Sequence, residues 1–140
     1  MTAQQPLYVL DSFALLAFFQ AEPGGVRVRE ALRQAASGDI RLVMTVINLG
    51  EVVYRTIREH GEDQAEEVLS LIAGYAIDFV DVDRDLALAG AAIKGVYRMA
   101  YADCIAAALT QRLDATVITG DPEFRQVEGL VKIEWLPASR

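Results

Sequence analysis

Cysteine and histidine are almost missing from this chain of 140 residues, which contains one of each, Cys104 and His60. A single cysteine excludes an internal disulfide and a cage of thiolates around a metal, so core packing is expected for Cys104. A single histidine, at a predicted helix end distant in sequence from every acidic motif, leaves no base for a Ser-His-Asp or Cys-His mechanism. It also argues against zinc, which normally takes His or Cys ligands.

Long apolar runs and phosphate-binding loops are also absent. A membrane-spanning helix needs roughly 20 apolar residues, whereas the run 7–19 is shorter and contains Asp11, and the Ala-rich stretch 86–109 contains Lys94 and Asp103. The first residues lack the basic and apolar segments of a signal peptide. We therefore expect no membrane contact and a cytoplasmic location. Without a GxxxxGK[ST] motif, nucleotide hydrolysis by that route is excluded.

Positive charge is scarce as well. The chain has 13 Lys and Arg against 20 Asp and Glu, and its net charge is −7. This balance argues against a protein that holds nucleic acid through overall basicity. The argument weakens if four acids bind metal, because two divalent cations add four positive charges to −7 and leave −3. Most of the basic residues are arginines, which suit contact with phosphate.

Apolar residues are abundant by contrast, at 53% of the chain with a mean hydropathy of +0.23. The length suits one domain spanning residues 1–140. Two interpretations account for the apolar excess: an unusually buried core, or an apolar surface that a partner covers. We prefer the second.

Short apolar runs alternate with longer segments of helical periodicity. Strands are predicted at 7–10, 40–44, 76–82, 116–119 and 131–136, and helices at 13–20, 26–36, 46–60, 63–73, 84–96, 101–113 and 122–127. Ser12 and Thr45 are the predicted caps of the helices that they precede. Strands separated by helices imply right-handed crossovers and a parallel sheet covered on both faces. The predicted fold is a three-layer α/β/α sandwich with a central parallel sheet of four to five strands.

Four acids fall where such a sheet places its functional crevice, beyond the carboxyl ends of the strands. Asp11 directly follows the first strand, and Asp121 follows the fourth by two residues. Glu51 lies three residues beyond Asn48 on the helix after the second strand, so both side chains point the same way. Asp103 lies in the first turn of its helix. We expect these acids to approach one edge of the sheet.

Each acid also has a purely structural explanation. An Asp at a strand end caps helices and turns, Asp103 is favoured by the positive helix terminus, and Glu51 can pair with Arg55 for about 0.3–0.5 kcal/mol. Their conjunction is harder to explain, because crowded carboxylates repel one another unless cations are present. Mg²⁺ or Mn²⁺ fits carboxylate ligands best. Such a site favours phosphodiester hydrolysis, with one ion activating water and another stabilising the leaving oxygen.

Four sequence blocks, 8–12, 48–52, 101–108 and 117–124, resemble those of the PIN-domain nucleases in order and spacing. Within that family the chain is similar to the VapC-type toxins. The resemblance implies an endoribonuclease dependent on Mg²⁺ or Mn²⁺ that cuts structured or single-stranded RNA. It also implies a cognate antitoxin that neutralises the enzyme.

The same resemblance suggests roles for individual residues. Asp11, Glu51 and Asp103 match the three most dependable acids of the family, and Asp121 matches a fourth, more variable one. Supporting roles around these catalytic and metal-binding acids fall to three polar side chains: Ser12, Asn48 and Thr119. Two positions depart from the family pattern. Gly120 stands where many relatives carry a basic or amide residue, so the RNA contact of that side chain is missing, and Cys104 replaces a common alanine.

Members of the family usually form homodimers and hold an antitoxin segment in a groove beside the first helices, which would explain the apolar excess. Candidate groove residues are Leu15, Leu16, Phe18 and Phe19, for which core packing is an equal alternative. Three arginines, Arg27, Arg29 and Arg33, are interpreted as a solvated helix face, with contact to RNA or antitoxin as the alternative.

Other interpretations explain the sequence less well. A haloacid-dehalogenase-like phosphatase needs a second Asp where this chain has Phe13, and a phospho-receiver domain needs a Lys after the strand 116–119, where none is found. The remaining alternative is a PIN-like domain that binds RNA or protein without cutting. The four intact acids argue against that loss of activity.

Overall fold

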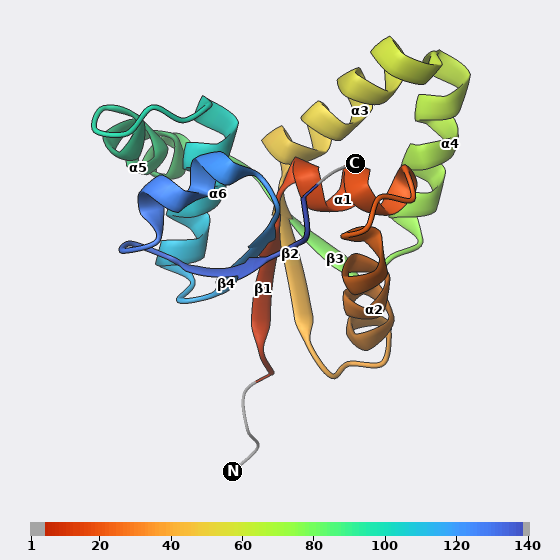
Figure 1. Ribbon diagram of the computed structural model, residues 1–140, viewed down its shortest axis with the longest axis horizontal. Helices are drawn as coiled ribbons and strands as arrows, with labels where there is room; N and C mark the ends of the chain where they lie inside the picture. Colours follow the sequence, from red (N-terminus) through yellow and green to blue (C-terminus); the bar gives the residue numbers. More distant parts are fainter. Residues whose placement is uncertain (1–4, 139–140) are drawn as a thin grey trace.

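The computed structural model describes residues 5–138, in which five parallel strands form one sheet with helices on both faces (Figure 1). The strand order is β3-β2-β1-β4-β5. The strands are β1 (Leu7–Leu10), β2 (Arg41–Thr45), β3 (Ile77–Val80), β4 (Thr116–Thr119) and β5 (Lys132–Trp135).

The connecting helices follow the predicted pattern closely. They are α1 (Ser12–Phe19), α2 (Gly25–Ala36), α3 (Val46–His60), α4 (Glu62–Ala73), α5 (Arg84–Lys94), α6 (Tyr101–Arg112) and the short 3₁₀ helix η1 (Pro122–Val127). In Figure 1, α1 to α4 lie to one side of the sheet and α5 and α6 to the other.

Alternating side chains of the strands build two separate cores. Leu10 and Ile118 belong to the cluster that contains the buried residues of α1 and α2. Val9 and Val117, one residue earlier on the same strands, belong to the cluster that contains those of α6 and η1. Both faces of the central strands are buried because successive side chains point to opposite faces. The predicted three-layer α/β/α sandwich with a parallel sheet is therefore confirmed, with five strands.

Two predicted details differ from the structure. Ser12 does not cap α1 but is its first residue, and Asp11 is the cap, because its side chain accepts a hydrogen bond from the Ala14 N–H at 2.9 Å. The third strand spans only Ile77–Val80 instead of 76–82, since β3 lies at the sheet edge and pairs with β2 alone. The cap at Thr45 is confirmed, with its hydroxyl accepting from the Asn48 N–H at 3.0 Å.

The two scarce residues lie as the sequence suggested. Cys104 is completely buried in the core beside α6. His60 ends α3, with its Nε2 4.0 Å from a carboxylate oxygen of Glu59. Within residues 5–138 no helix combines the length and apolarity needed to cross a membrane.

Successive strands are added on one side of β1 first and then on its other side. The chain passes from β1 to β2 and β3 on one side, and then crosses to β4 and β5 on the other. At such a switch point, helices leave neighbouring strands toward opposite faces and open a crevice at the carboxyl ends. The ends of β1 and β4, marked by Leu10 and Thr119, therefore frame the place where a functional site is expected.

Candidate active site

Asp11 is held at the end of β1 by two hydrogen bonds. Its Oδ1 accepts from the Ala14 N–H at 2.9 Å, and its Oδ2 accepts from the hydroxyl of Thr119 at the end of β4. Only 1% of Asp11 is exposed. Burial raises the pKa of Asp11 to about 7, the two hydrogen bonds oppose that rise, and the negative charges of Asp121 and Glu51 add to it.

Asp121 is positioned by the same Thr119. The Thr119 hydroxyl oxygen accepts from the Asp121 N–H at 3.0 Å, which fixes the turn after β4. The Asp121 side chain in turn accepts from the Glu123 N–H at 3.0 Å and caps η1. Asp121 thus follows the predicted strand end and lies half-buried. One threonine connects this acid to Asp11, 110 positions earlier in the sequence.

Glu51 is oriented by two donors on different helices. Its Oε1 accepts from the Ser12 hydroxyl at 3.0 Å and from the Asn48 side-chain amide at 3.0 Å. Asn48 is fully buried and is itself held by the Thr45 hydroxyl at 3.0 Å. Within residues 5–138 no ion pair joins Glu51 to Arg55, so the surface-pair explanation for this glutamate fails.

Asp103 lies in the first turn of α6 and is only 6% exposed. No hydrogen-bond donor contacts its carboxylate in the described part of the chain. Its pKa is raised to about 8, first by burial and then by the charges of Asp11, Asp121, Glu51 and Glu123. A buried carboxylate without donors, facing four other acids, is costly to keep ionised.

A fifth acid completes the cluster. Carboxylate oxygens of Asp103, Asp121 and Glu123 lie within 4.8 Å of one another. Glu123 also accepts from the Ala100 N–H at 3.2 Å, which ties η1 to the start of α6. Sequence reasoning did not single out Glu123, although its place two residues after Asp121 offered a signal. Asp11 belongs to the electrostatic environment of this trio but not to the trio itself.

The donor set of this site consists of carboxylates supported by hydroxyl and amide groups. Such a set fits a hard divalent cation, which takes oxygen ligands and offsets the burial and the like charges that together raise the pKa of Asp103. The raised pKa of Asp11 has the same origin in burial and like charge. Within residues 5–138 the acids of the trio are the one group found with metal-binding spacing.

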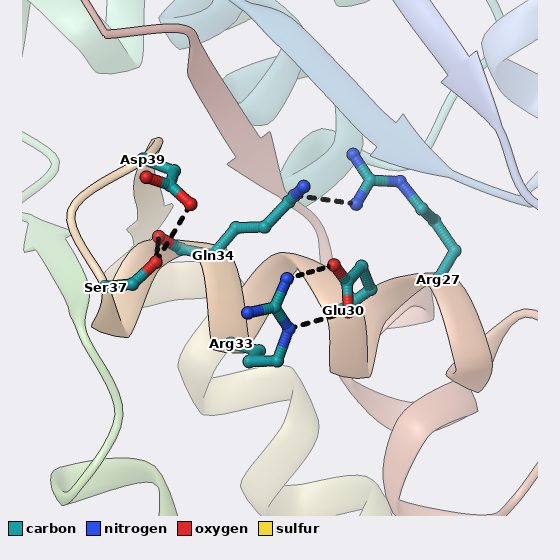
Figure 2. Close-up of polar contacts among 6 residues, drawn as sticks. All are labelled: Arg27, Glu30, Arg33, Gln34, Ser37 and Asp39. Carbon is teal, nitrogen blue, oxygen red and sulfur yellow. Dashed lines mark hydrogen bonds and ion pairs between the residues drawn. The ribbon is translucent and has the colours of Figure 1, made fainter.

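Two of the three arginines of α2, Arg27 and Arg33, pair with acids of this chain. Nε of Arg27 lies 2.6 Å from a carboxylate oxygen of Glu134 on β5. The Arg27 guanidinium also reaches Gln34 at 3.3 Å (Figure 2). Arg33 pairs with Glu30 at 2.5 Å. Two of the three predicted candidates for RNA contact are therefore neutralised by neighbouring acids, and Arg27 fastens α2 to the edge of the sheet.

The candidate groove residues separate into two kinds. Leu16 and Phe19 line a cleft of about 310 Å³ together with Val68 and other residues of α3 and α4. Phe18 lines a second cleft of about 210 Å³ beside the start of α2. Leu15 is completely buried, so its alternative interpretation as a core residue holds.

The sequence model of the PIN domain matches residues 8–130, a range that includes Asp11, Glu51, Asp103, Asp121 and Glu123. The chain belongs to the PIN-domain family. No curated protein sequence matches it significantly. The fold is thus that of a PIN domain.

Several solved structures share this PIN fold. DNA-bound VapBC from Salmonella typhimurium has a TM-score of 0.70 at 18% identity, covering 93% of this chain and 98% of that one. VapC20 from Mycobacterium tuberculosis, described as a toxin that cleaves the sarcin-ricin loop, has a TM-score of 0.69 at 16% identity, covering 90% and 97%. A toxin-antitoxin complex from Klebsiella pneumoniae has a TM-score of 0.65 at 20% identity, covering 89% and 96%. At these identities the likeness establishes the fold.

Proposed function

We propose that this PIN domain is an endoribonuclease dependent on Mg²⁺ or Mn²⁺ that acts as the toxin of a toxin–antitoxin pair. The observation that carries the proposal is the convergence of acids from four separate elements on one crevice. Burial and the negative charges of the other acids of the site raise the pKa of Asp103 to about 8. Without cations such an arrangement is unfavourable, which supports a site built to bind them.

The proposed ligands are Asp11, Glu51, Asp103 and Asp121, together with Glu123. A bound Mg²⁺ or Mn²⁺ supplies Lewis acidity that activates water and stabilises negative charge on the phosphodiester. The trio of Asp103, Asp121 and Glu123 supports this assignment most directly, because its oxygens lie within 4.8 Å of one another.

The polar residues of the chain set the orientation of these carboxylates. Thr119 directs Asp11, and Ser12 and Asn48 direct Oε1 of Glu51. With pKa values of about 7 and about 8, Asp11 and Asp103 carry protons for much of the time at neutral pH. They must release these protons to serve as ligands, so cation binding strengthens as the pH rises.

The surface of the domain supports protein partners. The cleft lined by Leu16 and Phe19 is our proposed seat for an antitoxin segment. Large apolar side chains elsewhere are well exposed, among them Leu88 at 62% and Val96 at 75%, which supports a homodimer. The structural neighbours named as toxin-antitoxin complexes agree with this proposal. Because RNA is the proposed substrate, we also propose a cytoplasmic location.

The decisive experiment is cleavage of a mixed RNA pool by the purified protein with Mg²⁺ or Mn²⁺. We expect wild-type protein to cleave and EDTA to abolish cleavage. Asp11→Asn and Asp103→Asn should be inactive, because each removes a proposed ligand while nearly preserving the shape of the side chain. Growth arrest on expression, relieved by a neighbouring reading frame, would support the toxin role.

The outcomes separate the proposal from its rival, a PIN-like domain that binds without cutting. Equal cleavage by wild type and Asp11→Asn would indicate a contaminating nuclease and contradict the proposal. RNA binding without cleavage under either metal would favour the rival. A folded control is provided by Asp114→Asn, since Asp114 is exposed and pairs with Lys132 at 3.2 Å.

A further inference from the structure

A third cleft, of about 540 Å³, lies next to the turn that carries Asp121. Its walls come from the start of α1, from the turn around Asp121, from η1 and from the end of β5. Gly120 and Pro122 flank Asp121 directly, and Phe13 follows Asp11 by two residues. The cleft therefore lies beside the turn that carries Asp121, although none of the five acids lines it.

Trp135 lines this cleft from the end of β5, on the strand next to the one that carries Thr119. Trp135 pairs with Thr119 in the register of β4 and β5, so their side chains lie on the same face of the sheet. The N–H of Leu136 donates to the Thr119 carbonyl at 2.8 Å and locks this register. Trp135 is 39% exposed. Neighbouring strands are about 4.8 Å apart, so the indole lies one strand from the threonine that holds Asp11.

Phe13 supplies a second aromatic wall because residue 120 is glycine. A Cβ atom at Gly120 would come 2.6 Å from Cζ of Phe13, closer than such atoms can approach. The ring of Phe13 therefore occupies the space that a side chain at position 120 would need. The missing side chain at Gly120 thus gives this chain an aromatic surface beside the acids.

Arg125 of η1 provides positive charge at the same cleft. It is exposed and lines the cleft. Across residues 5–138 it takes part in no ion pair, in contrast to Arg27 and Arg33. Glu128, three residues after Arg125, also lines the cleft and leaves room for one phosphate contact rather than two. Aromatic faces with an adjacent unpaired guanidinium form the combination that binds a base and its neighbouring phosphate in single strands.

We infer that this cleft receives one unstacked nucleobase of the RNA strand, next to the phosphate that the acidic cluster addresses. The indole of Trp135 stacks on the base, Phe13 closes the other side, and Arg125 contacts a flanking phosphate. The substrate class is then RNA with an unpaired base beside the scissile bond, since a base within a duplex cannot enter the cleft. This inference rests on the proposed nuclease function.

Trp135 is the only tryptophan of the chain, so its fluorescence reports directly on the cleft. Three RNA probes are compared: a short single-stranded oligoribonucleotide, its duplex, and the same strand with abasic residues. Each probe is titrated, in the presence of Mg²⁺, into the Asp11→Asn variant, in which cleavage is expected to be blocked. A titration with Mg²⁺ alone measures the contribution of the cation. We expect saturable quenching by the single strand, and little quenching by the duplex or the abasic strand.

Variants of the cleft supply a second readout on the otherwise wild-type protein. Trp135→Ala should raise KM for RNA by about 10-fold, in line with the loss of one base stack, with a smaller change in kcat, and Trp135→Phe should recover most of the loss. Arg125→Ala should reduce the slope of log affinity against log salt by about one, and Arg125→Lys should restore it. Lys132→Ala, an exposed cation on the same strand, is the matched control and should change neither.

Binding of labelled RNA, followed by anisotropy, separates failure of this inference from failure of the proposed function. RNA that binds and is cleaved while Trp135 emission stays constant would overturn the base subsite and leave the nuclease intact. Equal quenching by the abasic strand would also overturn it, because a sugar-phosphate backbone would then lie on the indole. Quenching by an antitoxin peptide but not by RNA would assign the cleft to a protein partner. If the RNA is neither bound nor cleaved, both proposals are rejected.

Discussion

The Thr119 hydroxyl donates a hydrogen bond to Oδ2 of Asp11 and accepts one from the Asp121 N–H at 3.0 Å. Thr119 ends β4, and Asp11 directly follows β1, so this single hydroxyl couples the two central strands at their carboxyl ends. It is completely buried. The relative position of two proposed ligands therefore depends on one small side chain that carries no charge.

Replacing this hydroxyl tests its importance. Thr119→Val keeps the shape of the side chain but removes both hydrogen bonds, so Asp11 loses a donor and its pKa rises further. We expect Mg²⁺ affinity and RNA cleavage to fall by about 10- to 100-fold, the usual effect of losing a group that orients a metal ligand. Thr119→Ser should stay within a few-fold of wild type. Unchanged Mg²⁺ binding in Thr119→Val, measured by calorimetry, would contradict this role.

The stability of the metal-free protein should depend on pH in an unusual direction. Asp11 and Asp103 have pKa values of about 7 and about 8 in the folded state, above the ordinary value of 3.8. The folded state therefore binds protons more tightly than the unfolded chain, and this stabilisation is complete below about pH 4. It declines as the pH rises and is lost above both raised pKa values. We expect the Tm in EDTA to fall from about pH 6 to about pH 8.5.

Matched variants isolate the source of that decline. Asp103→Asn removes one titrating group, so its Tm should fall less steeply with pH, and at about pH 8.5 the variant should be more stable than wild type in EDTA. Mg²⁺ should raise the Tm of wild type more at high pH than at low pH, because fewer protons then compete. Parallel curves for wild type and variant would show that Asp103 does not cause the decline.

Glu123 is a proposed ligand that sequence reasoning missed, and its replacement gives a separate test. Glu123→Gln removes one charge from the trio but keeps an oxygen that accepts from the Ala100 N–H, so the link between η1 and α6 should survive. We expect Mg²⁺ affinity to fall by about 10-fold or more, read from the Mg²⁺-induced shift in Tm. Glu128→Gln is the control, because Glu128 is exposed on the same segment and lies outside the trio. Equal shifts in both variants would exclude Glu123 as a ligand.

Much of the fold could be predicted from the sequence, because the patterns that indicate strands and helices are local. Apolar runs and helix caps predicted the order of strands and helices, and the rule of the carboxyl edge predicted that Asp11 and Asp121 would lie near each other. The cap of α1 was misassigned by one residue, because Asp11 and Ser12 are both good caps and only the backbone geometry decides between them.

The contacts whose partners were not predicted link residues far apart in the chain, although Thr119 itself was predicted to support the acids. Thr119 and Asp11 are separated by 108 positions, and Arg27 and Glu134 by 107. Periodicity tells which face of an element a residue occupies, but not which residue of another element lies opposite. For that reason the arginines of α2 remained candidates for RNA contact until the structure paired Arg27 with β5.

Gly120 provides the last prediction, because the absence of its side chain shapes both the site and the cleft. In Gly120→Ala the new Cβ would collide with the Phe13 ring, whose Cζ would lie 2.6 Å away, so the ring must move within the cleft that it lines. We expect a loss of about 1–3 kcal/mol in the free energy of unfolding, weaker RNA binding and altered Trp135 fluorescence. Gly129→Ala is the control, since a Cβ there meets no atom within 4 Å.

A double variant tests whether the Phe13 ring causes the loss of stability. When Phe13→Ala is combined with Gly120→Ala, the ring is no longer present to collide with the new Cβ. The losses in unfolding free energy of the two single variants should therefore not add. Strict additivity of the two unfolding free energies would show that the Phe13 ring does not occupy the space above Gly120.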